Sequence, residues 1–281
     1  MHFKRLVLIL VSFACCAQES TKKAIILDIG NVLVGPAKIE SFKAAFTVAG
    51  AEPFVSYFAN NPAMIHGSTE KMRCQLIYPF LRNCLPYDQG YALYDELGQR
   101  MPQMMVAWLT GHMNCQRLRA ICQEKAALYS SWFASQSERD LVRALTTVMF
   151  TPHYLVRTQK LLQKSVDFVY ACKKAGYHMY ILSNWDAESF PELIKKDPSF
   201  FALFDGIVTS GACGYAKPDQ KIYEHILRTY QLEATNCFFI DDLMQNVEAA
   251  QAVGITAAQC LRCDIETIKP AFERWANSLP K

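Results

Sequence analysis

The stretch that decides the fold is Ala24–Val34, with the sequence AIILDIGNVLV. An apolar run leads into Asp28, and the chain then turns through Ile29, Gly30 and Asn31. We expect residues 24–34 to form a buried first strand that delivers one carboxylate to the end of a sheet. In open α/β sheets, ligands bind outside the carboxyl ends of the strands. An Asp in this position also serves simply to cap a turn, so the interpretation depends on the rest of the chain.

Length and composition are those of an ordinary globular protein. The chain has 281 residues, of which 51% are hydrophobic and 20% charged, so it can bury the core of one large domain or two smaller ones. The formal net charge is +3 and there is no long basic run, so we expect no nucleic-acid partner. We also expect no membrane span after residue 20.

The first twenty residues have the layout of a secretory signal peptide. A basic start, Met1–Arg5, precedes an apolar run from Leu6 to Ala14, and Ala17 offers a cleavage position. The apolar run is short for a membrane span, which needs about 20 residues. We expect residues 1–20 to be removed and the mature chain to be exported, either periplasmic or secreted. A cytoplasmic chain with an uncleaved tail and a membrane-anchored chain are the alternatives.

Eleven cysteines are scattered through the sequence, and two of them, Cys15 and Cys16, lie in this N-terminal segment. Several others fall in apolar patterns, where Cys acts as a small buried hydrophobe. Cys260 and Cys263 form a lone CxxC motif without a second pair. Packing or a disulfide is therefore favoured there over a zinc site.

The pattern changes after the first strand. Between residues 36 and 151, aromatic and methionine residues recur at helical spacing, and turn signals such as Asn61-Pro62 divide them. We expect a separate, mostly helical module whose methionine and aromatic side chains form its own core. A lipid or cofactor pocket in this module is the alternative.

From residue 152 onward, strands and helices alternate. Helices are predicted over Val156–Lys174, from Pro218, and over Leu243–Val253. Four strands are predicted at Tyr177–Leu182, Phe204–Val208, Cys237–Ile240 and Ile255–Ala258. With the first strand, they predict an α/β fold whose parallel sheet has at least five strands and right-handed crossovers.

Polar residues stand where the predicted strands end. In chain order they are Asp28, Ser183 with Asn184, Lys217 a few residues beyond a strand end, and Asp241 with Asp242. Because the ends of parallel strands share one edge, these side chains should converge. Two adjacent aspartates near a third repel one another unless a cation lies between them, and Mg²⁺ suits a few carboxylates with phosphate oxygens and water. Each feature alone has a plainer role, such as capping a helix, but together they predict a phosphate site.

The order and spacing of these elements resemble the haloacid dehalogenase superfamily of hydrolases, in its group with a helical cap between the first two motifs. The resemblance implies a Rossmann-like core formed by residues 21–35 and 152–281, and a cap over residues 36–151. The first motif, Asp28-Ile-Gly-Asn-Val32, is similar to that of a branch of sugar-1-phosphate phosphatases. The resemblance covers the core and says little about the cap.

The resemblance assigns a role to each motif. Asp28 would be the nucleophile that forms an aspartyl-phosphate, and Lys217 would offset charge on it and on the phosphoryl group. The phosphate would be held by Ser183, Asn184 and Lys217, and the cofactor Mg²⁺ by Asp28, the carbonyl of Gly30, Asp241 and Asp242. The implied activity is a phosphatase acting on a small phosphorylated metabolite, with sugar phosphates among the candidates.

One position departs from the usual family motif. The first motif is ordinarily Asp-x-Asp, and its second aspartate is the general acid and base, but here that position is Gly30. General acid–base help is worth about 10² to 10⁴ in rate. Two interpretations therefore compete with an active phosphatase. One is a catalytically weak or inactive protein that binds a ligand or partner; the other is a dehalogenase, which needs no metal.

Overall fold

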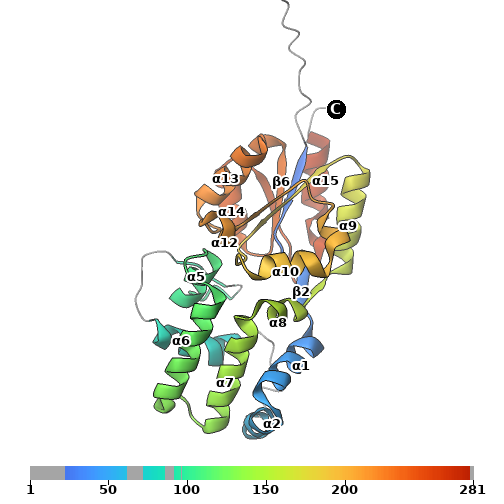
Figure 1. Cartoon of the computed structure of the whole chain (residues 1–281). Helices are drawn as coiled ribbons and strands as arrows, with labels where there is room; N and C mark the ends of the chain where they lie inside the picture. The colour runs from blue at the N-terminus through green and yellow to red at the C-terminus, as the bar shows by residue number, and fades with distance from the viewer. Residues whose placement is uncertain (1–22, 62–71, 86–91, 96, 279–281) are drawn as a thin grey trace, which may run out of the picture.

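The computed structural model describes residues 23–61, 72–85, 92–95 and 97–278 (Figure 1). The predicted signal peptide lies outside the described residues. Within the described part of the chain, no helix is both long and apolar enough to cross a membrane.

A parallel sheet of five strands forms the core. The strands, in chain order, are β1 (Ala24–Leu27), β4 (His178–Ser183), β5 (Gly206–Thr209), β6 (Cys237–Asp241) and β7 (Thr256–Gln259). Their order across the sheet is β5-β4-β1-β6-β7, so the first strand lies in the middle. The predicted α/β fold with a Rossmann-like parallel sheet is confirmed.

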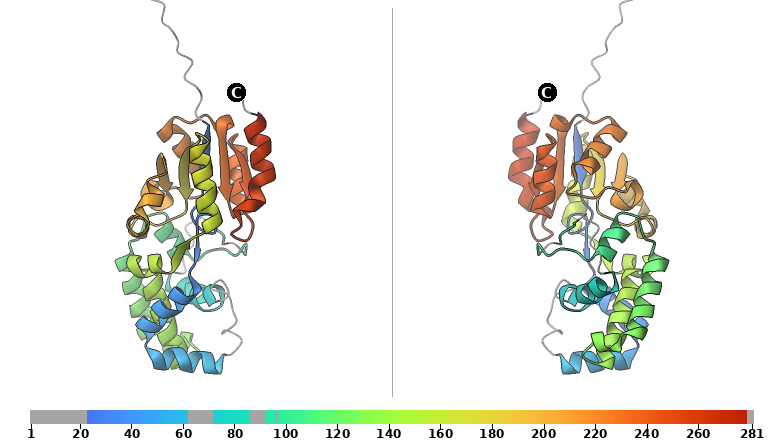
Figure 2. Two further views of the ribbon diagram at one scale, coloured as in Figure 1. Left: turned by 90° about the vertical axis from the view of Figure 1, so that its right-hand side faces the viewer. Right: turned by 90° about the vertical axis from the view of Figure 1, so that its left-hand side faces the viewer.

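Helices cover both faces of this sheet (Figure 2). Alternate side chains of β1 point to opposite faces: Ile25 and Leu27 join one apolar cluster, and Ala24 and Ile26 join the other. The first cluster is completed by α9 (Gln163–Lys174), α10 (Ser189–Lys196), α11 (Pro198–Phe201) and α15 (Lys269–Ser278). The second is completed by α13 (Gln220–Tyr230) and α14 (Met244–Ala252). A strand buried on both faces explains why AIIL is continuously apolar.

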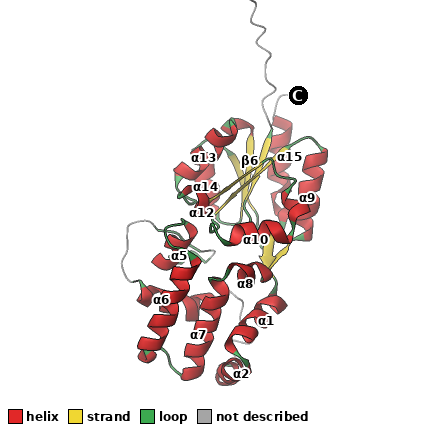
Figure 3. Cartoon of the chain, in the orientation of Figure 1, coloured by secondary structure: helices red, strands yellow, loops and turns green. Residues whose placement is uncertain are grey.

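The helical cap follows the first strand, as predicted. It lies beyond the carboxyl ends of the strands (Figure 3). Its elements are α1 (Lys38–Ala49), α2 (Ala51–Asn60), a π-helical turn (Arg73–Ile77), α4 (Tyr78–Cys84), α5 (Gln103–Leu109), α6 (Cys115–Leu128), α7 (Gln136–Met149) and α8 (Pro152–Arg157). Met104, Trp108 and Phe150 are buried together in the cap interior. The methionine and aromatic pattern of this region therefore corresponds to a core.

A two-stranded antiparallel ribbon carries the chain between cap and sheet. It consists of β2 (Val34–Pro36) and β3 (Gln159–Leu161), which pair with each other along their length. The ribbon is extended by the backbone N–H of Leu162, which donates to the carbonyl of Leu33 over 2.9 Å. The segment that leads from the sheet into the cap is thus hydrogen-bonded to the segment that returns.

This ribbon overturns one sequence prediction. A single helix over Val156–Lys174 is wrong, because α8 ends at Arg157 and α9 begins only at Gln163. Backbone pairing with β2 draws the intervening residues into a strand. Leu162, which fitted the helical spacing, packs against Gly35 instead. A Cβ added to Gly35 would lie 3.0 Å from the Leu162 side chain.

The first strand is also shorter than the predicted residues 24–34. It ends at Leu27, because the carbonyl of Ile29 accepts hydrogen bonds from the N–H groups of Leu33 and Val34, both over 2.9 Å, and closes a tight turn. Asn31 occupies this turn with a φ of +56°, a conformation that Asn tolerates better than most residues.

The structure records no disulfide among the cysteines it describes. Cys260, from the lone CxxC motif, is buried in the apolar cluster on one face of the sheet. It has the packing role that its surroundings in the sequence favoured.

Candidate active site

The carboxyl ends of β1 and β6 bring the three predicted aspartates together. Asp28, Asp241 and Asp242 each offer a carboxylate oxygen, and these atoms lie within 4.8 Å of one another. Asp28 and Asp241 are buried, and Asp242 is partly exposed. Strands 1 and 6 are neighbours in the sheet, so residues far apart in the sequence meet at one point.

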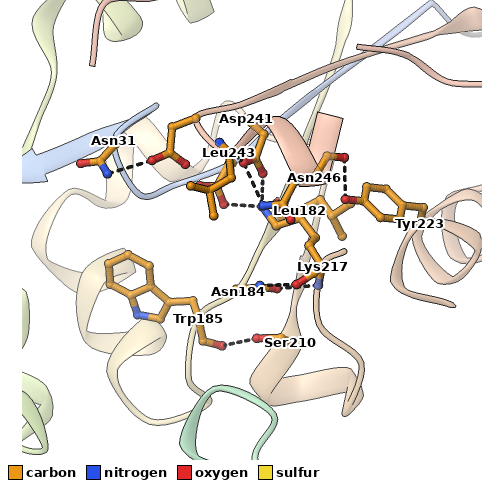
Figure 4. Close-up of polar contacts among 12 residues, drawn as sticks. Asn31, Leu182, Asn184, Trp185, Ser210, Lys217, Tyr223, Asp241, Leu243 and Asn246 are labelled. Carbon is orange, nitrogen blue, oxygen red and sulfur yellow. Dashed lines mark hydrogen bonds and ion pairs between the residues drawn. The ribbon is translucent and has the colours of Figure 1, made fainter. Parts of the chain in front are cut away.

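Lys217 lies among these carboxylates, although it is carried by a loop rather than a strand. Its Nζ donates to Asp28 Oδ1 over 2.7 Å. It also donates to Asp241 Oδ2 over 2.5 Å and to the carbonyl of Leu182 over 2.9 Å (Figure 4). An ammonium group has three donors, so all three are used. The side chain is only 1% exposed, which fixes the charge in place.

Ser183, the last residue of β4, and Asn184, which follows it, have different tasks. Ser183 is buried, and its hydroxyl acts to lower the pKa of the nearby Asp28. The side chain of Asn184 instead holds the backbone of Lys217: its Oδ1 accepts from the lysine N–H and its Nδ2 donates to the lysine carbonyl, both over 2.8 Å (Figure 4). We expected Asn184 to hold phosphate. Its side chain is committed to the lysine loop, which lies outside the sheet and is tied to β4 by these bonds.

Asn246 is a site residue that the sequence analysis missed. It lies in the first turn of α14, is 3% exposed, and donates from Nδ2 to Asp241 Oδ1 over 2.9 Å. The N–H of Leu243 donates to the same oxygen over 2.8 Å. These two donors and Lys217 orient Asp241 completely. The signal available in the sequence was a polar residue on the otherwise apolar face of that helix.

Asn31 orients the other adjacent aspartate. Its Nδ2 donates to Asp242 Oδ2 over 2.9 Å. Its place in the first motif was visible in the sequence, but its partner was not, because Asp242 is 211 positions away.

Burial and crowding shift the proton affinities of these groups. Burial raises the pKa of Asp28, although Lys217 opposes the shift. Burial, with the nearby Asp28 and Asp241, raises the pKa of Asp242 to about 7. Burial disfavours the charged form of Lys217, but Asp241 and Asp28 outweigh that effect and raise its pKa. The lysine therefore stays charged, and one ammonium cannot balance three carboxylates, so Asp28 and Asp242 hold protons more readily than free aspartates do.

This imbalance makes the residues a good fit for a divalent cation. If all three carboxyl groups were ionised around the one ammonium, two negative charges would be uncompensated, and the raised pKa values of Asp28 and Asp242 reflect burial together with this crowding. Carboxylate oxygens are the donors that Mg²⁺ prefers. Asp28 and Asp242 are the best placed to hold it, since both oxygens of Asp241 already accept hydrogen bonds from the protein.

Gly30 leaves space beside the nucleophile position. A Cβ added there would meet only Asp28 Oδ2, at 3.8 Å, which is ordinary contact. The backbone of Gly30 is not in the left-handed region that requires glycine. The missing second aspartate of the motif is therefore not forced by lack of room.

The cap contacts the core next to this site. Ser210, which follows β5, donates from Oγ to the carbonyl of Leu109 in α5 over 2.5 Å, and the N–H of Cys115 donates to Glu188 Oε2, also over 2.5 Å. Gly111 and Gly211 touch: an added Cβ at Gly111 would lie 2.5 Å from the Gly211 carbonyl oxygen. These contacts hold the cap against the loops that follow β4 and β5.

Comparisons with known proteins show the family to which the chain belongs. The family model described as haloacid dehalogenase-like hydrolase matches residues 22–254, and the chain belongs to this family of hydrolases. A solved structure of a HAD-like family hydrolase from Porphyromonas gingivalis is similar in fold, with a TM-score of 0.53 at 17% identity, covering 92% of this chain and all of that one.

Two curated relatives carry phosphatase names. The sesquiterpene phosphatase astK of Aspergillus oryzae is 40% identical over 83 residues, which cover 30% of this chain and 42% of that protein. The phosphatase MT3486 of Mycobacterium tuberculosis is 27% identical over 85 residues, covering 30% of this chain and 39% of that one. The chain thus matches less than half the length of either relative.

Proposed function

We propose that this protein is a Mg²⁺-dependent phosphatase that hydrolyses a small phosphate monoester through an aspartyl-phosphate on Asp28. The observation that carries the proposal is the buried Lys217, which binds Asp28 and Asp241 at once and faces a third carboxylate, Asp242. Family membership as a hydrolase and the phosphatase names of two partial relatives support it.

The proposed reaction has two steps. Asp28 attacks phosphorus, the ester P–O bond breaks, and the alcohol leaves with a proton from water; a second water then hydrolyses the aspartyl-phosphate to release phosphate. Lys217 holds Asp28 in position and offsets the equatorial charge of the phosphoryl group, while Ser183 donates toward the same carboxylate. A bound Mg²⁺ would supply further charge neutralisation at the phosphoryl oxygens.

Two competing functions predict different chemistry. A dehalogenase needs no metal, and the excess carboxylates argue against it. A catalytically weak or inactive binding protein is favoured only by Gly30, whereas intact Asp28, Lys217 and Asp242 argue for turnover. The narrower assignment to the sugar-1-phosphate branch rests on the first motif alone and stays a prediction.

The test is phosphate release from p-nitrophenyl phosphate, sugar phosphates and terpenyl phosphates, with Mg²⁺ or with chelator. The variant Asp28→Asn is run beside Asp167→Asn, a matched change at an exposed residue of α9. We expect release that needs Mg²⁺ and Asp28 and survives the control change. Equal release by Asp28→Asn, or halide release from a 2-haloacid in chelator, would overturn the proposal.

We also propose that residues 1–20 direct export of the chain and are then removed. The basic start, the short apolar run and the small residue Ala17 support this. Intact mass and N-terminal sequencing of the protein recovered from its native cells test it: a chain that retains Met1 would contradict it.

A further inference from the structure

A cavity of about 280 Å³, partly open to solvent, lies between the helices of the cap and the ribbon. Its walls come from α1, α2, the π-helical turn, α7 and α8, together with residues of β2 and β3. Helices α1, α7 and α8 pack on one another below the ribbon in Figure 1.

The cavity adjoins the candidate active site. Asn31 lines the cavity, and its side chain donates to Asp242. Gly30, the residue before it, presents no side chain and has room beside Asp28. A molecule whose phosphate lies at Asp28 can therefore extend past Gly30 and Asn31 into the cap.

The cavity wall is mainly apolar. The side chains that give it this character are Ala45, Phe54, Ile77, Leu145, Val148 and Leu155. Such a surface stabilises a ligand by removing apolar groups from water and offers few groups for a sugar hydroxyl to bind.

The polar side chains on the wall already have partners inside the protein. Ser41 donates to the carbonyl of Ala37 over 3.1 Å, Thr158 to that of Leu155 over 2.6 Å, and Gln159 to Thr158 over 3.1 Å. The guanidinium of Arg73 lies 5.6 Å from the centroid of the Tyr78 ring. A polyhydroxylated substrate would have to displace the bonds of Ser41, Thr158 and Gln159 to pair with these side chains, which makes it a poorer occupant than a hydrocarbon chain.

From these contacts we propose that the substrate is the monophosphate of an apolar alcohol, whose hydrocarbon part occupies the cap cavity. This proposal rests on the proposed phosphatase function and names its substrate class. An engineered cavity of about 150 Å³ binds benzene, so this one suits a chain of roughly ten to twelve carbons. The reaction is unchanged: Asp28 displaces the alcohol from phosphorus, water hydrolyses the aspartyl-phosphate, and the net products are phosphate and the free alcohol.

The first test is a chain-length series on the wild-type protein with Mg²⁺. We expect kcat/KM to rise two- to fourfold per methylene, hence by at least about 50-fold from n-butyl to n-decyl phosphate, and then to level off. Glucose-1-phosphate should be hydrolysed no faster than n-butyl phosphate. A flat or falling series, with active turnover of p-nitrophenyl phosphate, would overturn the proposal.

The second test fills the cavity. Leu145→Trp on α7 should lower kcat/KM for n-decyl phosphate by at least tenfold and leave p-nitrophenyl phosphate within threefold. Leu128→Trp is the matched control, because Leu128 is 65% exposed on α6 and does not line the cavity. Circular dichroism confirms that both variants fold. If both variants changed kcat/KM equally for both substrates, the proposed binding of the hydrocarbon part in the cavity would be contradicted.

Binding of non-hydrolysable phosphonates separates this proposal from the phosphatase proposal. Calorimetry on the wild-type protein compares n-decylphosphonate with n-butylphosphonate. Tighter binding of the longer chain by 50-fold or more supports the cavity as the hydrocarbon site even if no ester is hydrolysed. Equal affinities would overturn it even if the enzyme proves to be a phosphatase.

Discussion

The core and the cap are stabilised in different ways, and the difference indicates what each contributes. At the centre of the core, a buried lysine is bonded to two aspartates, and asparagine side chains fix the groups around it. The cap interior is apolar, with Leu81, Met104 and Leu118 fully buried. Charged contacts demand particular residue types, whereas apolar packing tolerates exchange. Changes in the core should therefore alter turnover, and changes in the cap should alter substrate choice.

The largest effect is expected from removing the central charge. Lys217→Met should lower kcat by about 10³-fold and destabilise the fold by about 3–5 kcal/mol, because Asp28 and Asp241 would be left buried without their partner. Steady-state kinetics and urea unfolding measure both effects. Lys221→Met, an exposed position on α13, is the control. Activity within tenfold of wild type would show that the core does not depend on this lysine.

An increase in turnover is expected when Gly30 is replaced by the aspartate that usually stands in the first motif of the family. Gly30→Asp should raise kcat by about 10² for esters with poor leaving groups, because the new carboxyl restores an acid beside Asp28 and an added Cβ has room. Little change is expected for p-nitrophenyl phosphate, whose leaving group needs no proton. Gly30→Asn is nearly isosteric and lacks the acid, so it should give no gain. Equal rates for the Asp and Asn variants would mean that acid catalysis is supplied by another group.

A smaller loss is expected from a residue that only positions the site. Asn246→Ala removes one of the two N–H donors to Asp241 Oδ1 and should reduce activity by about 10- to 100-fold, with a higher Mg²⁺ requirement. A Mg²⁺ titration of phosphate release checks it. Glu248→Ala, exposed on the same helix, should have no effect. If extra Mg²⁺ leaves the loss untouched, Asn246 acts through folding rather than through Asp241.

The smallest effect is expected where the cap meets the core. Gly111→Ala and Gly98→Ala place a side chain at a similar positive φ, +73° and +70°, but only Gly111 faces a neighbour, the Gly211 carbonyl. Gly98→Ala should cost about 1 kcal/mol, and Gly111→Ala about 1–3 kcal/mol more, with a few-fold loss of activity. Thermal unfolding and kinetics compare them. Identical losses would show that this contact does not hold the cap in place.

The sequence predicted the sheet well because buried parallel strands are short apolar runs followed by polar residues. Four strand predictions agree with β4, β5, β6 and β7 to within two residues at each end. The helix over Val156–Lys174 failed because Gln159–Leu161 pairs with a strand more than a hundred positions earlier. Helical periodicity is a local signal, and it contains nothing about such pairing.

The sequence by itself determined the order of strands and helices, the place of the cap in the chain, and the residues that could meet at the strand ends. It did so because burial patterns and turn residues act over a few positions. Only the tertiary structure decided that Asn184 holds the lysine loop, that Asn31 and Asn246 orient the aspartates, and that an apolar cavity adjoins the site. Those features are contacts between segments distant in the sequence, and they exist only once the chain has folded.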